Sequence, residues 1–106
     1  MVIYEVNLRV DQEAAADFDA WLVPHVEQML GFAGFEKASR WVRLDPPESE
    51  NPSCWWTVHY EVESMEALQA YFDGPSAQMR GDGLARFGGR FEATRRVLKR
   101  SDLAPR

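Results

Sequence analysis

The chain has 106 residues, which suffices for one domain and leaves no room for a second hydrophobic core. Hydrophobic residues make up 45% and charged residues 27%, a globular composition that argues against a disordered chain. Twelve Lys and Arg against seventeen Asp and Glu give a net charge of −5, which argues against a nucleic-acid partner because binding phosphates needs a basic surface.

The first predicted element is a half-buried strand over residues 2–10, where apolar and polar side chains alternate. Asp11 is the expected N-cap of a helix over residues 12–30, along which apolar side chains recur at helical spacing. Pro24 lies inside this stretch and predicts a kink rather than two helices, because proline lacks the N–H that the preceding turn would accept.

The remainder of the chain is predicted as a series of strands, breaks and helices. In order these are a strand over 35–45, a polar, proline-rich loop over 45–53, a strand over 54–63, a helix capped by Ser64, a break at Gly74-Pro75, a helix over 76–86, a strand over 90–99 and a frayed tail from Ser101.

The order of these elements predicts an α+β fold. It is a ferredoxin-like βαββαβ antiparallel sheet of spatial order 4-1-3-2, with both crossovers right-handed and the helices on one face. We expect the first and third strands to be central, parallel neighbours. A doubly wound sheet is disfavoured because its strands would be almost continuously apolar. The whole fold is expected to be a single domain over residues 1–100.

The sheet face without helices is predicted to mix polar and apolar side chains. Its two central strands place there Ile3, Glu5, Asn7 and Arg9 beside Trp55, Thr57, His59 and Glu61. Such a face is too polar for a core and somewhat apolar for open water. We expect a homodimer in which two copies pack face to face around a semi-polar lumen, with a small-molecule pocket inside it. The alternative is a monomer with a solvated sheet face, which antiparallel sheets tolerate.

Charge is distributed unevenly along the chain. Residues 1–85 hold fifteen acidic and five basic residues, whereas residues 86–106 hold two acidic and seven basic ones. The basic last strand is open to three interpretations: ion pairing within or between subunits, protection of a sheet edge, or binding of an anionic ligand.

His59 is the first candidate catalytic residue. It is predicted to face the lumen near Glu5, Asn7 and Glu61, and a carboxylate beside an imidazole raises its basicity and fixes its tautomer, as a general base requires. Asn7 and Arg9 could orient a carbonyl or carboxylate group, and Trp55 could stack on a planar ligand. The competing interpretation for each of them is packing at a polar interface.

His25 is the second candidate, as a ligand-binding residue that shares one side of the first helix with Trp21. A packed histidine without chemistry is the alternative. The two histidines do not have metal-ligand spacing, and the glycine pairs lack the residues of a phosphate loop, so no metal and no cofactor are expected. Cys54 is the only cysteine, which excludes an intramolecular disulfide and favours the reducing cytoplasm. No membrane span and no signal peptide are visible.

Several motifs resemble a family of small bacterial proteins known as a domain of unknown function, over about residues 2–99. They are Ile3-Tyr4-Glu5-Val6-Asn7, Trp21 with His25 and Met29, Trp56-Thr57-Val58-His59-Tyr60, Tyr71 with Pro75 and Met79, and Arg86-Phe87-Gly88-Gly89-Arg90-Phe91 before Arg95-Arg96-Val97-Leu98. The resemblance implies a dimeric α+β barrel and no particular reaction.

The wider superfamily contains cofactor-free monooxygenases, haem-degrading enzymes and many binding modules. Its haem-degrading branch is expected to have an asparagine on the first strand, a tryptophan on the third and a histidine on the second helix. Asn7 matches and Trp55 or Trp56 could match, but residues 64–89 contain no histidine. We therefore predict a cofactor-independent, oxygenase-like enzyme, or alternatively a non-catalytic dimeric module that binds a ligand or a protein.

Overall fold

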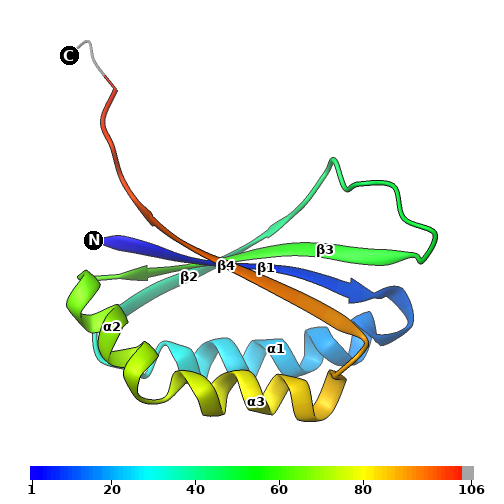
Figure 1. Ribbon diagram of the computed structural model, residues 1–106, viewed down its shortest axis with the longest axis horizontal. Helices are drawn as coiled ribbons and strands as arrows, with labels where there is room; N and C mark the ends of the chain where they lie inside the picture. Colours follow the sequence, from blue (N-terminus) through cyan, green and yellow to red (C-terminus); the bar gives the residue numbers. More distant parts are fainter. Residues whose placement is uncertain (104–106) are drawn as a thin grey trace.

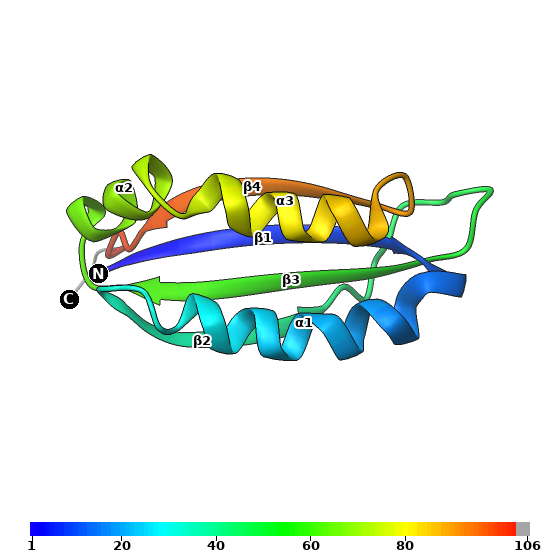
Figure 2. The same ribbon diagram turned by 90° about the horizontal axis from the view of Figure 1, so that it is seen from below.

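The computed structural model, which describes residues 1–103, contains one four-stranded antiparallel sheet with its helices on one face (Figures 1 and 2). The elements are β1 (Val2–Asp11), a short 3-10 turn (Gln12–Ala14), α1 (Ala15–Met29), β2 (Phe35–Val42), β3 (Ser53–Val62), α2 (Met65–Asp73), α3 (Ser76–Phe87) and β4 (Phe91–Lys99). The strands lie in the order β2-β3-β1-β4. This confirms the ferredoxin-like α+β fold and the predicted order 4-1-3-2.

The prediction that the two central strands run parallel is wrong. Val2 of β1 pairs with Val62 of β3, and Val10 pairs with Cys54, so these strands are antiparallel. The crossover through α1 makes β1 parallel to β2, and the loop after β2 then turns the chain back. β3 lies between β2 and β1 and therefore runs antiparallel to both of them.

The ends of the elements differ from the predictions by more than one residue at two places, the start of α1 and the end of β2. Asp11 does not cap the first helix with its side chain, because its carboxylate accepts a hydrogen bond of 2.7 Å from Arg9 instead, and a 3-10 turn precedes α1. β2 ends at Val42 rather than at residue 45. Two other predictions hold: α1 continues through Pro24 as one helix, and the Ser64 hydroxyl caps α2 by accepting from the Ala67 N–H at 3.1 Å.

The core lies between the sheet and the helices and is built from alternate strand residues and one face of each helix. Its buried members include Tyr4, Leu8, Val10, Phe18, Met29, Val58, Tyr60, Val62, Leu68, Tyr71, Met79 and Phe87. Trp56 is partly buried and packs against this core. The opposite sheet face carries no helix (Figure 1).

The chain beyond β4 has no regular structure at residues 101–103, which are exposed; the frayed tail from Ser101 stays a prediction. The rest of that predicted tail, residues 104–106, lies outside the described part. None of the helices in residues 1–103 has the length and apolarity needed to cross a membrane.

Candidate functional site

Strand pairing brings together most of the residues predicted for the helix-free face. Glu5 of β1 lies directly opposite His59 of β3, and Asn7 lies opposite Thr57. The Thr57 hydroxyl donates a hydrogen bond of 2.7 Å to the Asn7 side-chain oxygen. Glu61 is on the same face opposite Ile3, and it has no ion pair with another described residue. The antiparallel register therefore gives His59 the Glu5 neighbour that the sequence predicted.

Glu5 is the centre of a hydrogen-bond network on this face. Its carboxylate is only 6% exposed and accepts from His59 Nε2 at 2.9 Å, from Asn7 Nδ2 at 2.9 Å and from Arg96 Nε of β4. The hydrogen bond from Arg96 is the main cause that lowers the pKa of Glu5 to about 2, against the opposing effect of burial. An ionised Glu5 can only accept, so His59 Nε2 carries the proton in this pair.

The other end of the face is also held by internal contacts. Arg9 donates to Asp11 at 2.7 Å and to the Ser53 hydroxyl at 3.0 Å. The Arg43 guanidinium lies 5.7 Å from the ring centre of Trp55, a cation–π distance. A hollow of about 210 Å³ lies here and is lined in part by Asn7, Arg9, Arg43 and Trp55, but His59 is not part of its lining.

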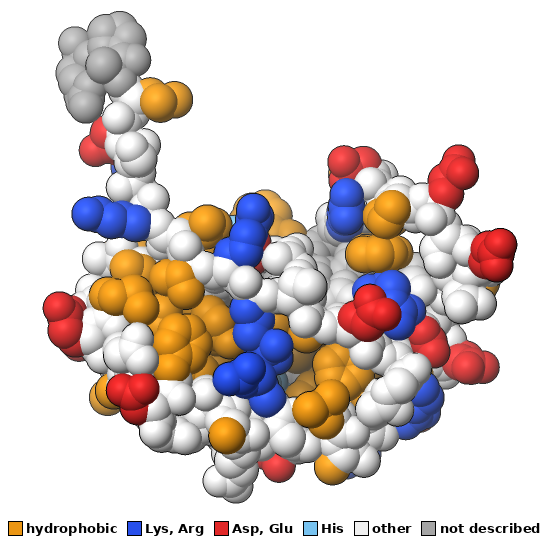
Figure 3. Space-filling view, viewed as in Figure 1, with side chains coloured by type: hydrophobic (Ala, Val, Ile, Leu, Met, Phe, Trp, Pro, Cys, Tyr) orange, Lys and Arg blue, Asp and Glu red, His pale blue; other side chains and the backbone are white. Residues whose placement is uncertain are grey.

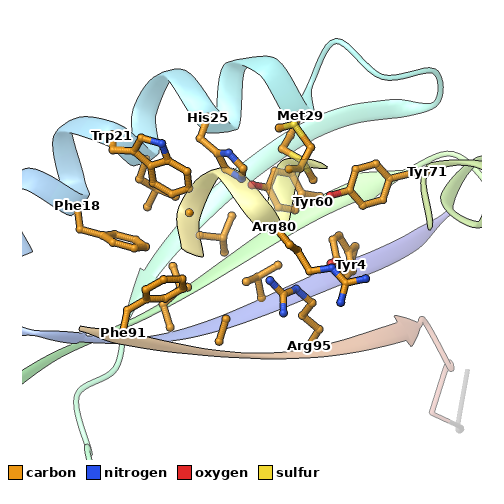
Figure 4. Close-up of a pocket in the computed structure, with 17 residues that line it drawn as sticks. Tyr4, Phe18, Trp21, His25, Met29, Tyr60, Tyr71, Arg80, Phe91 and Arg95 are labelled. Atoms are coloured by element: carbon orange, nitrogen blue, oxygen red, sulfur yellow. The ribbon is translucent and has the colours of Figure 1, made fainter. Parts of the chain in front are cut away.

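A different pocket lies on the other side of the sheet, between the strands and the helices (Figure 4). Its walls are mainly aromatic and aliphatic, and they come from β1, β3, β4 and all three α-helices. The cavity volume is about 50 Å³, while the whole hollow with its open mouth measures about 520 Å³. The closed part holds a few waters or one diatomic gas molecule, so an organic ligand would occupy the mouth as well.

His25 is the predicted site residue that lines this pocket. Its ring stacks on Trp21, with ring centres 4.4 Å apart and planes 25° apart, and it points from α1 into the space above the sheet (Figure 4). Burial lowers the pKa of His25, and this effect outweighs the attraction of Asp82 for the protonated form. A neutral imidazole results at neutral pH, and such a group can accept a proton from a ligand.

The mouth of the pocket carries two arginines that the sequence analysis did not single out. Arg80 comes from α3 and Arg95 from β4, and Figure 4 shows both side chains near Tyr4. A signal for Arg95 was present: it interrupts an alternation of inward side chains formed by Phe91, Ala93 and Val97. Tyr4, Tyr60 and Tyr71 also line the pocket, but their spacing is that of ordinary core residues.

The structure does not assemble the haem-degrading pattern, because its histidine is missing. Asn7 and Trp55 lie on the helix-free face, as their pairing with Thr57 and Arg9 shows, whereas neither α2 nor α3 contains a histidine, and His25 lies on α1 on the opposite side of the sheet. Within residues 1–103, no cluster of three or more His, Cys, Asp or Glu side chains could hold a metal ion.

Comparison with known proteins identifies a family and a fold. A family model for a domain of unknown function, DUF4286, matches residues 1–101. No curated protein sequence is significantly similar to the chain.

Three solved structures show the same architecture. A proposed antibiotic biosynthesis monooxygenase from Deinococcus radiodurans is 16% identical, with a TM-score of 0.68 and coverage of 99% of this chain and 97% of that one. SnoaB, a cofactor-independent oxygenase from Streptomyces nogalater, is 12% identical, with a TM-score of 0.65 and coverage of 99% and 98%. The haem degrader MhuD from Mycobacterium tuberculosis, with two haems in its active site, is 17% identical, with a TM-score of 0.64 and coverage of 98% and 100%. At these identities the likeness shows the fold alone.

Proposed function

The chain belongs to the DUF4286 family, and from the pocket that its fold builds we propose that it is a cofactor-independent oxygenase acting on a small planar molecule. The observation that carries this proposal is His25, a partly buried imidazole with a lowered pKa inside an aromatic-walled pocket. The oxygenase named among the structural neighbours supports the reaction class by analogy of fold only.

The chemistry proposed for the pocket begins with a proton transfer. His25 removes a proton from an acidic C–H group of the substrate, and the electron pair left on that carbon reduces dioxygen. Oxidation of a CH₂ group balances as R₂CH₂ + O₂ → R₂C=O + H₂O, with dioxygen as the oxidant and both hydrogens leaving in water. The protein supplies the base and the position of the substrate.

Oxygen consumption tests this proposal. Anthrone is a suitable probe because it is planar and has an acidic CH₂ group, and its uncatalysed oxidation gives the background rate. We expect a rate above background for the natural protein and a loss of at least tenfold for His25→Gln. Background rates for the natural protein would contradict the oxygenase and leave the non-catalytic binding module.

His59, Asn7 and Trp55 remain predicted site residues on the helix-free face, and the same assay decides between the two sites. His59→Gln is the matched variant, since it makes the same substitution on the other side of the sheet. Loss of activity in His59→Gln with full activity in His25→Gln would place the chemistry on the helix-free face, where Glu5 supports His59.

We also propose that the protein is a homodimer joined through the helix-free face. Trp41 and Leu98 are 58% and 36% exposed and share this face with the Glu5 network. A second copy would cover these apolar side chains and both sheet edges. Sedimentation equilibrium should give twice the chain mass, and Trp41→Lys should shift the mass towards that of one chain. A single-chain mass for the natural protein would contradict the dimer.

The bacterial origin and the cytoplasmic location expected from the sequence are proposals of the same kind. Cys54 is a free, partly buried thiol, which suits a reducing compartment. Cell fractionation of a bacterial host should recover the protein with the cytoplasmic fraction, and recovery from the periplasm would contradict this location.

A further inference from the structure

We propose that the mouth of the pocket is a binding site for an organic anion, so that the substrate carries a carboxylate or an ionised enol at this end. The inference deepens the proposed function, because it names the class of molecule that the pocket takes. It depends on the placement of charges and hydrogen-bond donors around the mouth, and not on the reaction that follows.

The two arginines at the mouth of the pocket have no carboxylate partner among the described residues. Neither Arg80 nor Arg95 forms an ion pair with a described residue, and the recorded hydrogen bond of Arg80 is a long one of 3.5 Å to the Ser76 hydroxyl. In the same residues 1–103, other arginines do pair with carboxylates: Arg9, Arg40, Arg43, Arg96 and Arg100. The charge at the mouth is therefore left for a partner from outside the chain.

Arg95 lies on the side of the sheet that faces the helices. It pairs with Val6 on β1 and so points to the helix side, where the neighbouring inward residues of β4 are Ala93 and Val97. Desolvating an arginine beside a core is costly unless its guanidinium finds an anion or stays in water. Arg95 is exposed, and its long side chain reaches the mouth, where the guanidinium stays in water and is accessible to an anion.

The hydroxyl groups of two tyrosines lie at the same end of the pocket. Tyr60 and Tyr71 are 2% and 4% exposed, and within the described residues no hydrogen bond from either hydroxyl is found. Burial raises the pKa of Tyr71 to about 12 and raises that of Tyr60 further, so both hydroxyls keep their protons and can donate. No buried side-chain nitrogen or oxygen atom of the described residues lacks a hydrogen-bond partner, so these unpaired hydroxyl oxygens are open to the pocket space, where a ligand that accepts hydrogen bonds can reach them.

Within the described residues, no carboxylate pairs with these arginines at the mouth; their partners are neutral hydroxyls, Ser76 for Arg80 and Tyr4 for Arg95. The Arg80 and Arg95 side chains and the tyrosine rings face a common space in Figure 4. On the outer surface, Lys and Arg side chains gather between two hydrophobic areas, in the region between the strand β4 and the helix α3 (Figures 1 and 3). Two cations and several hydroxyl donors around an apolar cavity fit a planar molecule with one anionic end.

Calorimetric titration with a matched pair of ligands tests the inference. 1-Hydroxy-2-naphthoate carries the carboxylate, and 1-hydroxy-2-naphthamide has nearly the same shape without the charge. We expect the acid to bind at least tenfold more tightly than the amide. Arg80→Gln and Arg95→Gln should each reduce this preference several-fold, and the double variant should abolish it. Arg100→Gln is the control, because Arg100 pairs with Asp102 beyond the end of β4 and does not line the pocket.

The outcomes separate this inference from the proposed reaction. Equal binding of acid and amide, no binding of either, or an unchanged preference in both arginine variants would overturn the anion site. A preference for the acid together with background oxygen consumption would leave the anion site standing and remove the oxygenase. The NMR signals of the His25 ring should shift on binding of the acid, and shifts confined to the His59 ring would place the ligand on the wrong side of the sheet.

Discussion

Glu5 and His59 lie directly opposite each other on β1 and β3, and the carboxylate Oε1 is 2.9 Å from the imidazole Nε2. The pair is on the helix-free side of the sheet, whereas the pocket that contains His25 is on the helix side. The two histidines of the chain thus lie in two different environments: His59 is hydrogen-bonded on a polar face, and His25 is desolvated among aromatic side chains.

The Glu5 network predicts a specific loss of stability in acid. The pKa of Glu5 is about 2 in the folded protein and 4.5 ordinarily, so its contribution is present above pH 4.5 and is lost as the pH falls towards 2. Allowing for solvent around the exposed Arg96, we expect about 1 kcal/mol. Urea unfolding at pH 6 and pH 3 should show a smaller acid-induced loss for Glu5→Gln than for the natural protein. Glu61→Gln, on the same face, should behave like the natural protein, and equal losses in all three would contradict this role of Glu5.

His25 predicts a second pH effect, from the opposite side of the sheet. Its folded pKa lies below the ordinary 6.5, so unfolding takes up a proton and stability falls as the pH drops below 6.5. The NMR titration of the His25 ring should have its midpoint below that value, and His25→Gln should remove this part of the pH dependence of unfolding. A midpoint at or above 6.5 would mean that the imidazole is not desolvated as described.

The sequence predicted the elements and the sheet order well, because alternation and helical spacing record which side of each element is buried. Strand direction was predicted wrongly for β1 and β3, since alternation is the same in parallel and antiparallel neighbours. Glu5 beside His59 was predictable from which residues share a face. The pocket was not, because Tyr60 and Tyr71 have the pattern of core residues, and only the assembled fold brings them to Arg80 and Arg95.

The hydroxyls of Tyr60 and Tyr71 predict an unusual result for tyrosine substitution. Replacing a buried, hydrogen-bonded tyrosine by phenylalanine usually costs about 1 kcal/mol. Tyr71→Phe should leave the free energy of unfolding unchanged or slightly raised, because its hydroxyl has no partner among the described residues, while binding of 1-hydroxy-2-naphthoate weakens several-fold. Ser64→Ala is the contrasting variant, since it removes a cap that is made and should cost about 1 kcal/mol. A comparable loss in both variants would show that the Tyr71 hydroxyl is already bonded.

Gly83 controls how closely α3 approaches α1 beside the pocket. A Cβ atom at this position would lie 3.2 Å from Cη2 of Trp21 and 3.6 Å from Cζ of Phe91, whereas one at Gly81 would meet nothing within 4 Å. Alanine favours a helix over glycine by about 1 kcal/mol, so Gly81→Ala should stabilise the protein by up to that amount. Gly83→Ala should gain less, because Trp21 is held by its stack on His25 and must move.

A larger side chain at position 83 should make the same crowding visible in both stability and binding. We expect Gly83→Val to lower the free energy of unfolding by roughly 1–3 kcal/mol, as overpacking does, and to weaken naphthoate binding by displacing Trp21 into the cavity. Urea unfolding measures the first effect and calorimetric titration the second. If Gly83→Val unfolded like Gly81→Val and bound the acid normally, the contact between α3 and Trp21 would not define the pocket wall, and the ligand would have to enter from elsewhere.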